Sequence, residues 1–97
     1  MRFVVLFEDD PAKADIRPRL MPDHQAFLKR NAARILEAGP LAETDGAAAG
    51  GLWLVEHDSA DAVMALVRED PFWPTGLRRS VRVLAWRRVF AAGQSLI

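Results

Sequence analysis

The sequence of 97 residues contains no cysteine and only two histidines, His24 and His57. The absence of cysteine excludes a disulfide framework, a thiolate nucleophile and a cysteine-ligated zinc site. Basic and acidic side chains number 13 each, so the formal net charge is zero. A general nucleic-acid binder needs a basic surplus to displace counterions, and we therefore expect no nucleic-acid partner.

The chain also lacks a long apolar run. Its first one, residues 3–7, is too short for a signal peptide and is followed at once by Glu8, Asp9 and Asp10. No stretch approaches the roughly 20 apolar residues of a membrane-spanning helix. We therefore expect a cytoplasmic protein with no membrane partner, and the length predicts one domain with a modest core.

Apolar patterning predicts the strands and helices. Three runs rich in β-branched and aromatic residues favour strands: residues 3–7, 52–56 and 80–90. Thr44-Asp45-Gly46 is a turn signal, so the segments on either side of it are expected to form a short hairpin. A helix is predicted over residues 59–69, with Ser59 as its N-cap and Asp70-Pro71 beyond its last turn.

The first helix is expected over residues 22–38, because apolar residues recur there at three- and four-residue spacing: Phe27, Leu28, Ala32, Ile35 and Leu36. Pro22 suits the first turn of a helix. Gly39-Pro40 has the chemistry that ends one. Residues 91–97 show no periodicity and are expected to form a flexible tail, which leaves residues 1–90 as the domain.

The resulting β-α-β-β-α-β order is that of the α+β ferredoxin-like fold, an antiparallel sheet with two helices on one face. Its other face would be apolar here, because four residues cannot all point toward the helices: Trp53, Val55, Leu84 and Trp86. A large exposed apolar face indicates a partner, and the simplest partner is a second copy. We therefore predict a homodimer in which two sheets stack face to face.

His24 is the main candidate for proton chemistry, because imidazole is the side chain that titrates closest to neutral pH. In the predicted helix it lies at the edge of the apolar stripe, on the face of Phe27 and Asn31. It is therefore either a catalytic or ligand-binding group or a partly buried histidine bonded to the backbone. No metal-ligand spacing and no phosphate-binding glycine loop accompany it, so neither a metal nor a cofactor is expected.

Asp70 is the second candidate, because the dipole at a helix C-terminus disfavours a carboxylate and residues placed against a local rule are often functional. The alternative is an Asp-Pro turn in which the side chain bonds to the backbone. Most arginines are expected to be solvated, although an Arg78-Arg79 patch could hold an anionic ligand.

Several motifs stand in a specific order along residues 3–90: His24-Gln25-Ala26-Phe27-Leu28, Gly39-Pro40-Leu41, Asp45-Gly46, Asp70-Pro71-Phe72, Gly76-Leu77 and Trp86-Arg87-Arg88-Val89-Phe90. In this order and spacing the chain resembles the YCII-related (YciI-like) family. The resemblance implies a ferredoxin-like fold assembled as a dimeric α/β barrel. It also implies an enzyme with a histidine and an aspartate at its active site, related to muconolactone-type isomerases and, in one branch, to a dehydrochlorinase.

The family histidine falls on His24, but the family Asp-Arg pair reads Ala33-Arg34 here. The leading hypothesis is a small-molecule enzyme in which His24 moves a proton in a lactone isomerisation or an elimination and Asp70 orients it. The expected substrate-binding residues are Arg34, as anchor of an anionic group, with Asn31, Phe27, Phe72 and Trp73. The alternative is a non-catalytic dimeric module that binds a small ligand or a protein and has lost its acid at position 33.

Overall fold

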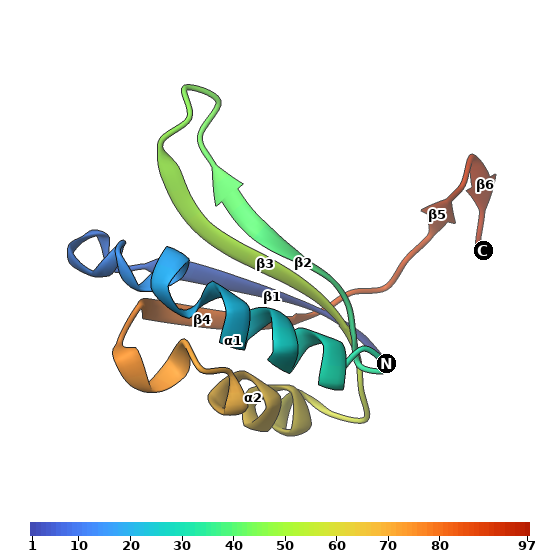
Figure 1. The fold of residues 1–97 in the computed structure, drawn as a ribbon. Helices are drawn as coiled ribbons and strands as arrows, with labels where there is room; N and C mark the ends of the chain where they lie inside the picture. The colour runs from blue at the N-terminus through green and yellow to red at the C-terminus, as the bar shows by residue number, and fades with distance from the viewer.

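The computed structural model describes all 97 residues. Its main elements are β1 (Arg2–Asp9), α1 (Ile16–Arg30), β2 (Ile35–Ala42), β3 (Ala48–Glu56), α2 (Ala60–Glu69) and β4 (Arg78–Ala85). The strands form one antiparallel sheet in the order β2-β3-β1-β4, and both helices lie on the same face of it (Figure 1). This is the predicted ferredoxin-like α+β fold.

The core fills the space between the sheet and the two helices. Strand residues that face the helices are buried, and they meet apolar side chains of α1 and α2: Phe3, Val5, Phe7, Trp53 and Val55 against Phe27, Val63, Leu66 and Val67. Trp53 and Val55 are only 1% and 0% exposed. Contrary to the prediction, they do not contribute to the open face. The strand register instead places five apolar residues on that face, Val4, Leu6, Leu52, Leu54 and Leu84, together with Arg82 opposite Leu6.

The prediction of the first helix was wrong at both ends, because α1 begins at Ile16 and stops at Arg30. Pro22 lies inside the helix rather than at its start, and its ring nitrogen has no proton to donate to the preceding turn. Asn31 follows the last turn, and its side-chain amide donates to the Phe27 carbonyl at 2.9 Å. The same carbonyl also accepts the backbone N–H of Asn31 at 3.2 Å, so residue 31 closes the last turn through two bonds.

The segment expected to be the second half of that helix is the edge strand β2. Ile35 is buried through its place opposite Val55 on β3, not through a helical stripe. Gly39-Pro40 does not end a helix, and Pro40 lies opposite Gly51 within the strand pair. An edge strand tolerates proline because one side of its backbone needs no ladder partner. The apolar spacing fits either structure, and pairing with β3 decides between them.

Two local expectations agree with the structure, the turn at Thr44-Asp45-Gly46 and the Ser59 cap. Gly46 adopts a φ of +95° in the turn between β2 and β3, and Ser59 caps α2 by accepting the Ala62 amide proton at 3.1 Å. Single helical turns, η1 (Pro11–Lys13) and η2 (Trp73–Thr75), precede α1 and β4. No helix has the length and apolar character to span a membrane.

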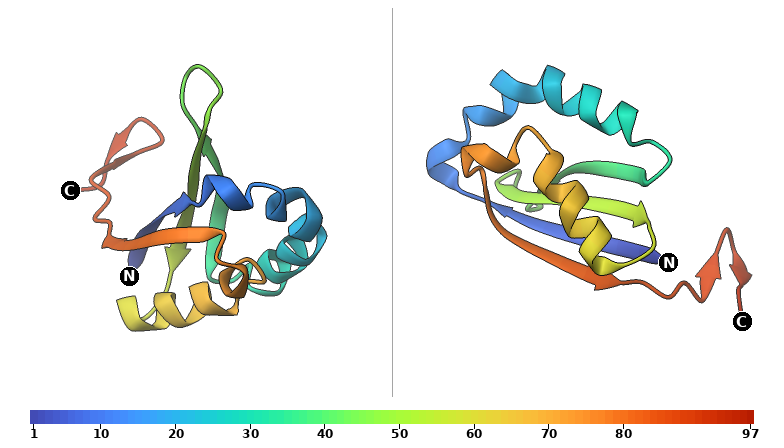
Figure 2. Two further views of the ribbon diagram at one scale, coloured as in Figure 1. Left: turned by 90° about the vertical axis from the view of Figure 1, so that its left-hand side faces the viewer. Right: turned by 90° about the horizontal axis from the view of Figure 1, so that it is seen from below.

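The C-terminal segment differs from its prediction. The last strand was expected over residues 80–90, but β4 ends at Ala85. The chain then leaves the sheet as an arm that carries two short strands, β5 (Phe90–Ala91) and β6 (Gln94–Ser95), paired with each other (Figure 2). The expected tail thus holds a small hairpin that contributes nothing to the core.

Candidate active site

A β-bulge aims one of two adjacent arginines into the domain. The register between β1 and β4 shifts between Glu8 and Asp9, so that Glu8 lies opposite Ser80 and Asp9 lies opposite Arg78. Strict alternation from the inward-facing Val81 would have turned Arg79 inward instead. The Arg78 side chain is consequently 3% exposed, whereas that of Arg79 is 58% exposed. Bulges re-aim side chains in this way and are frequent beside active sites.

His24 and Asp70 form a buried pair in the same region. His24 lies in the middle of α1 rather than in its first turn, and its Nδ1 is 2.9 Å from Oδ1 of Asp70. The imidazole stacks on the Phe72 ring, with 4.3 Å between the centroids and an angle of 20° between the planes. Asp70 ends α2, and the same Oδ1 accepts the Phe72 amide proton at 3.1 Å. Asp70 therefore both closes the turn and holds the imidazole.

These bonds indicate the tautomer of His24. A carboxylate only accepts hydrogen bonds, so Nδ1 of His24 must donate its proton to Asp70. Nε2 is then the nitrogen with a free lone pair. It has no hydrogen-bond partner in the protein, and it is not among the fully buried unpartnered atoms, which are Asp70 Oδ2 and Arg78 Nε. Nε2 is thus the nitrogen that a ligand can reach and the one that can accept a proton.

Alternating charges continue from this pair toward the surface, and we call the five residues the charge cluster: Asp9, Arg17, His24, Asp70 and Arg78. Arg78 Nη2 lies 3.8 Å from Asp70 Oδ2, and Arg78 Nη1 lies 3.2 Å from Asp9 Oδ1. Arg17 Nε lies 2.8 Å from the other oxygen of Asp9. Burial lowers the pKa of the Arg78 guanidinium below its ordinary value, and the nearby Asp9 offsets only part of this effect.

A cavity of about 140 Å³ adjoins His24. One face of α1 forms much of its wall, with Arg17, Met21, His24, Gln25 and Leu28. The opposite wall is Ala38, Gly39 and Pro40 of β2, and Trp53 of β3 and Arg78 of β4 complete the lining. Drug-sized ligands occupy pockets of roughly 300–1,000 Å³. The smaller volume here suits a single-ring molecule between an aromatic wall and charged groups.

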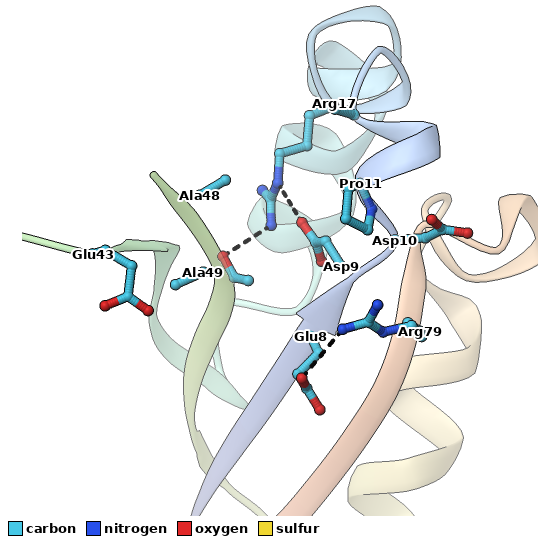
Figure 3. A pocket seen from close by; sticks show the side chains of 11 residues that line it. Glu8, Asp9, Asp10, Pro11, Arg17, Glu43, Ala48, Ala49 and Arg79 are labelled. Carbon is cyan, nitrogen blue, oxygen red and sulfur yellow. Dashed lines mark hydrogen bonds and ion pairs between the residues drawn. The ribbon is translucent and has the colours of Figure 1, made fainter. Parts of the chain in front are cut away.

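A larger hollow of about 340 Å³ lies beside it, between the ends of β1 and β3. Figure 3 shows Arg17 reaching into this hollow toward Asp9, with the Glu8–Arg79 ion pair also at its wall. Its lining contains no histidine and no aromatic side chain. The smaller cavity is the better candidate site, because it combines an available imidazole with an aromatic side chain, that of Trp53. Arg17 lines both hollows.

The structure brings together only some of the residues expected from the sequence. His24, Asp70 and Phe72 are in mutual contact. Phe27 lies in the core against Trp53, and Trp73 packs beside the same core, so neither lines the cavity. Phe27 and Trp73, expected from the sequence to bind the substrate, therefore lie outside the candidate cavity.

The remaining expected residues follow the end of α1. Asn31 bonds to the Phe27 carbonyl, and Arg34 lies 3.9 Å from Asp58 with its side chain 43% exposed. Neither lines the cavity. Ala33 lies in the turn between α1 and β2, where the missing acid leaves the His24–Asp70 pair intact.

Sequence reasoning missed Asp9 and Arg17 and did not separate Arg78 from Arg79. A helix that begins at Ile16 would have placed Arg17, Met21 and His24 on one face, at spacings of four and three residues. The misplaced helix start therefore concealed Arg17. No local pattern identifies the bulge that selects Arg78, because the bulge depends on the pairing of β1 with β4.

The fold and this site define a small ferredoxin-like α+β domain with a buried histidine–carboxylate pair beside a cavity. The chain belongs to the YCII-related family, because the model of the YCII-related domain matches residues 1–87. Among solved structures it is similar to 5-chloro-2-hydroxyhydroquinone dehydrochlorinase (TftG) from Burkholderia phenoliruptrix AC1100, in complex with 2,5-dihydroxybenzoquinone. The two share 28% identity with a TM-score of 0.79, over 90% of this chain and 94% of the other. No curated protein sequence matches the chain.

Proposed function

We propose that this protein is a small-molecule enzyme that eliminates hydrogen chloride, or a comparable leaving group, from a single-ring hydroxylated substrate. The observation that carries the proposal is the buried His24–Asp70 pair, whose free imidazole nitrogen adjoins a cavity of single-ring size. The likeness to a dehydrochlorinase, 28% identical over 90% of this chain, supports elimination over the lactone isomerisation that the sequence left equally open.

His24 is the proposed acid and base. Loss of hydrogen chloride from a chlorinated trihydroxybenzene removes two hydroxyl protons from oxygen. One is delivered to the carbon that carries chlorine, and the other leaves the ring as the carbon–chlorine bond breaks and chloride departs. The ring becomes a hydroxylated quinone, and the balance requires no oxidant. One base that returns its first proton as an acid performs both transfers, as Nε2 of His24 is proposed to do.

Asp70 is the proposed positioning residue for this base. Its hydrogen bond holds the proton on Nδ1, fixes the ring plane and stabilises the imidazolium formed when Nε2 takes a proton. The non-catalytic alternative depended on a missing acid at position 33. Asp70 supplies a carboxylate from a different element, so this alternative loses its main support.

The proposal is tested by chloride release from 5-chloro-2-hydroxyhydroquinone under anaerobic conditions. His24→Ala should lower kcat by about 10²–10⁴-fold, the usual contribution of general acid–base catalysis. His57→Ala is the matched control, because His57 lies outside both hollows and only accepts the Asp58 amide proton. Unchanged turnover in the His24 variant, with circular dichroism identical to wild type, would contradict the proposal. Binding without turnover in the wild type would favour a binding module.

We also propose that the domain forms a homodimer through its open sheet face. Five apolar residues on this face support the proposal: Val4, Leu6, Leu52, Leu54 and Leu84. Large exposed apolar patches on soluble proteins mark interaction sites. Sedimentation equilibrium should give twice the chain mass of 10.8 kDa, and a monomer at micromolar concentration would contradict the proposal.

A further inference from the structure

Two guanidinium groups in the cavity wall have more hydrogen-bond donors than the protein has acceptors for them. Each arginine carries five N–H groups. Arg17 donates from Nε to Asp9 at 2.8 Å and from Nη2 to the Gly50 carbonyl at 3.4 Å, and Arg78 donates from Nη1 to Asp9 at 3.2 Å. Most of the N–H groups of this pair therefore have no acceptor in the protein, and all of these except the fully buried Nε–H of Arg78 are candidate donors to an oxygen atom of a ligand.

The position of Arg78 is fixed by aromatic rings. Its guanidinium carbon lies 4.0 Å from the centroid of Phe7 and 5.2 Å from that of Phe72. Arg17 lies 5.6 Å from the centroid of Phe72. These contacts hold the guanidinium planes and leave their edges for hydrogen bonds, which preorganises the donors.

The balance of charge favours an anionic ligand once His24 is protonated. Asp9 offers one oxygen to each arginine, while Asp70 is shared between His24 and Arg78. Two guanidiniums thus face two carboxylates while His24 is neutral. Once His24 takes a proton, the charge cluster carries one surplus positive charge, which a bound oxyanion would neutralise.

Gly51 provides room for both guanidiniums. A Cβ atom at this position would lie 3.2 Å from Nη1 of Arg78 and 3.4 Å from Nη2 of Arg17. The first distance is tighter than most Cβ contacts and the second is ordinary, so an alanine here would require Nη1 of Arg78 to shift by a few tenths of an ångström. Glycine at this position therefore lets the backbone of β3 and the Arg78 guanidinium pack closely without that shift.

We propose that Arg17 and Arg78 bind the ionised oxygen of an enol or phenol, so that the cavity takes its substrate as a planar single-ring oxyanion. This inference deepens the proposed function by assigning the substrate class of the same site. It also replaces Arg34, the anchor expected from the sequence, with two arginines that line the cavity.

The test compares 2,5-dihydroxybenzoquinone with its dimethyl ether, 2,5-dimethoxybenzoquinone, by isothermal titration calorimetry at neutral pH. The first probe is ionised there, as its absorption spectrum would verify, and the second cannot ionise. Wild-type protein should bind the ionised probe at least about tenfold more tightly, the effect of one charge-assisted hydrogen bond. Equal affinity for both probes would overturn the inference.

Substitutions then show which residues produce the preference for the ionised probe. Arg17→Met should abolish it, and Arg17→Lys should restore part of it. Arg79→Met is the matched control and should leave it unchanged, because the Arg79 side chain is exposed and lies outside the cavity lining. A preference that survives Arg17→Met would refute the inference.

The binding measurement needs no turnover, so the two proposals fail separately. Full activity of His24→Ala with an intact oxyanion preference would refute only the acid–base role. Loss of activity in that variant, together with equal binding of both probes by wild-type protein, would refute only the oxyanion site.

Discussion

Arg78 and Arg79 are neighbours in the sequence, yet they belong to two different kinds of ionic contact. Arg78 is buried between Asp9 and Asp70, whereas Arg79 pairs with Glu8 at 3.4 Å on the surface. Exposed pairs of the second kind contribute roughly 0–1 kcal/mol to folding. For a buried pair, desolvation can exceed the Coulomb attraction, so such a pair is weak evidence for a stabilising role.

The difference between the two contacts indicates what the buried one is for. A domain that sought stability alone would place apolar side chains where Arg78, Asp70 and His24 lie. Two buried polar atoms of this group, Asp70 Oδ2 and Arg78 Nε, also lack a hydrogen-bond partner in the protein. Local rules of folding are usually broken at functional sites. The charge cluster is therefore best explained by chemistry, and the surface pairs by solubility.

The largest expected effect on stability is that of Asp70→Ala. The substitution leaves Arg78 and His24 without their shared carboxylate, and breaking a buried ion pair from one side costs about 3–5 kcal/mol. Urea unfolding followed by tryptophan fluorescence would measure the loss. Asp70→Asn is the control, because it keeps the acceptor for the Phe72 amide and should cost less. A loss below about 1 kcal/mol for Asp70→Ala would show that this carboxylate contributes no more to the free energy of unfolding than a surface ion pair does.

Arg34→Ala should have a much smaller effect. Arg34 and Asp58 are 3.9 Å apart and both side chains are exposed, so the free energy of unfolding should change by less than about 1 kcal/mol. The same urea titration measures it, with Arg34→Lys as control. A large loss of affinity for 2,5-dihydroxybenzoquinone in Arg34→Ala would instead support the anchoring role expected from the sequence.

The smallest expected effect is the pH dependence that Glu8 gives to the free energy of unfolding. The hydrogen bond from Ser80, at 2.8 Å, and the Arg79 guanidinium lower the pKa of Glu8 below its ordinary value of 4.5. The stabilisation from Glu8 is therefore complete above that value and is lost as pH falls through the lower pKa of the folded state. The difference in unfolding free energy between wild type and Glu8→Gln should shrink on acidification. A difference independent of pH would contradict this assignment.

The sequence was sufficient for the fold class, because strand composition, the Ser59 cap and the Thr44-Asp45-Gly46 turn are local signals that tertiary contacts reinforce. It failed where a non-local contact decides the structure. Residues 35–42 carry helix-like apolar spacing but pair with β3. A helix and an edge strand can accept the same pattern, so periodicity alone could not choose.

The candidate site was only partly predictable, because local signals mark some of its residues and non-local contacts position the others. His24 and Asp70 stand out by residue type and position, and Phe72 follows Asp70 in an Asp-Pro-Phe turn. Arg17 required the true start of α1, and Arg78 required the bulge opposite Asp9. Both depend on how distant segments meet, which one sequence does not reveal.

The contacts of the site also determine when it can exist during folding. His24 and Asp70 are 46 residues apart in the chain, and Asp9 and Arg78 are 69 residues apart. Contacts of such wide separation form only after long loops have closed, which slows them relative to helices and hairpins. A partly folded chain can therefore have α1, α2 and the β2–β3 hairpin without having the site. The chemistry proposed here belongs to the finished domain and to none of its parts.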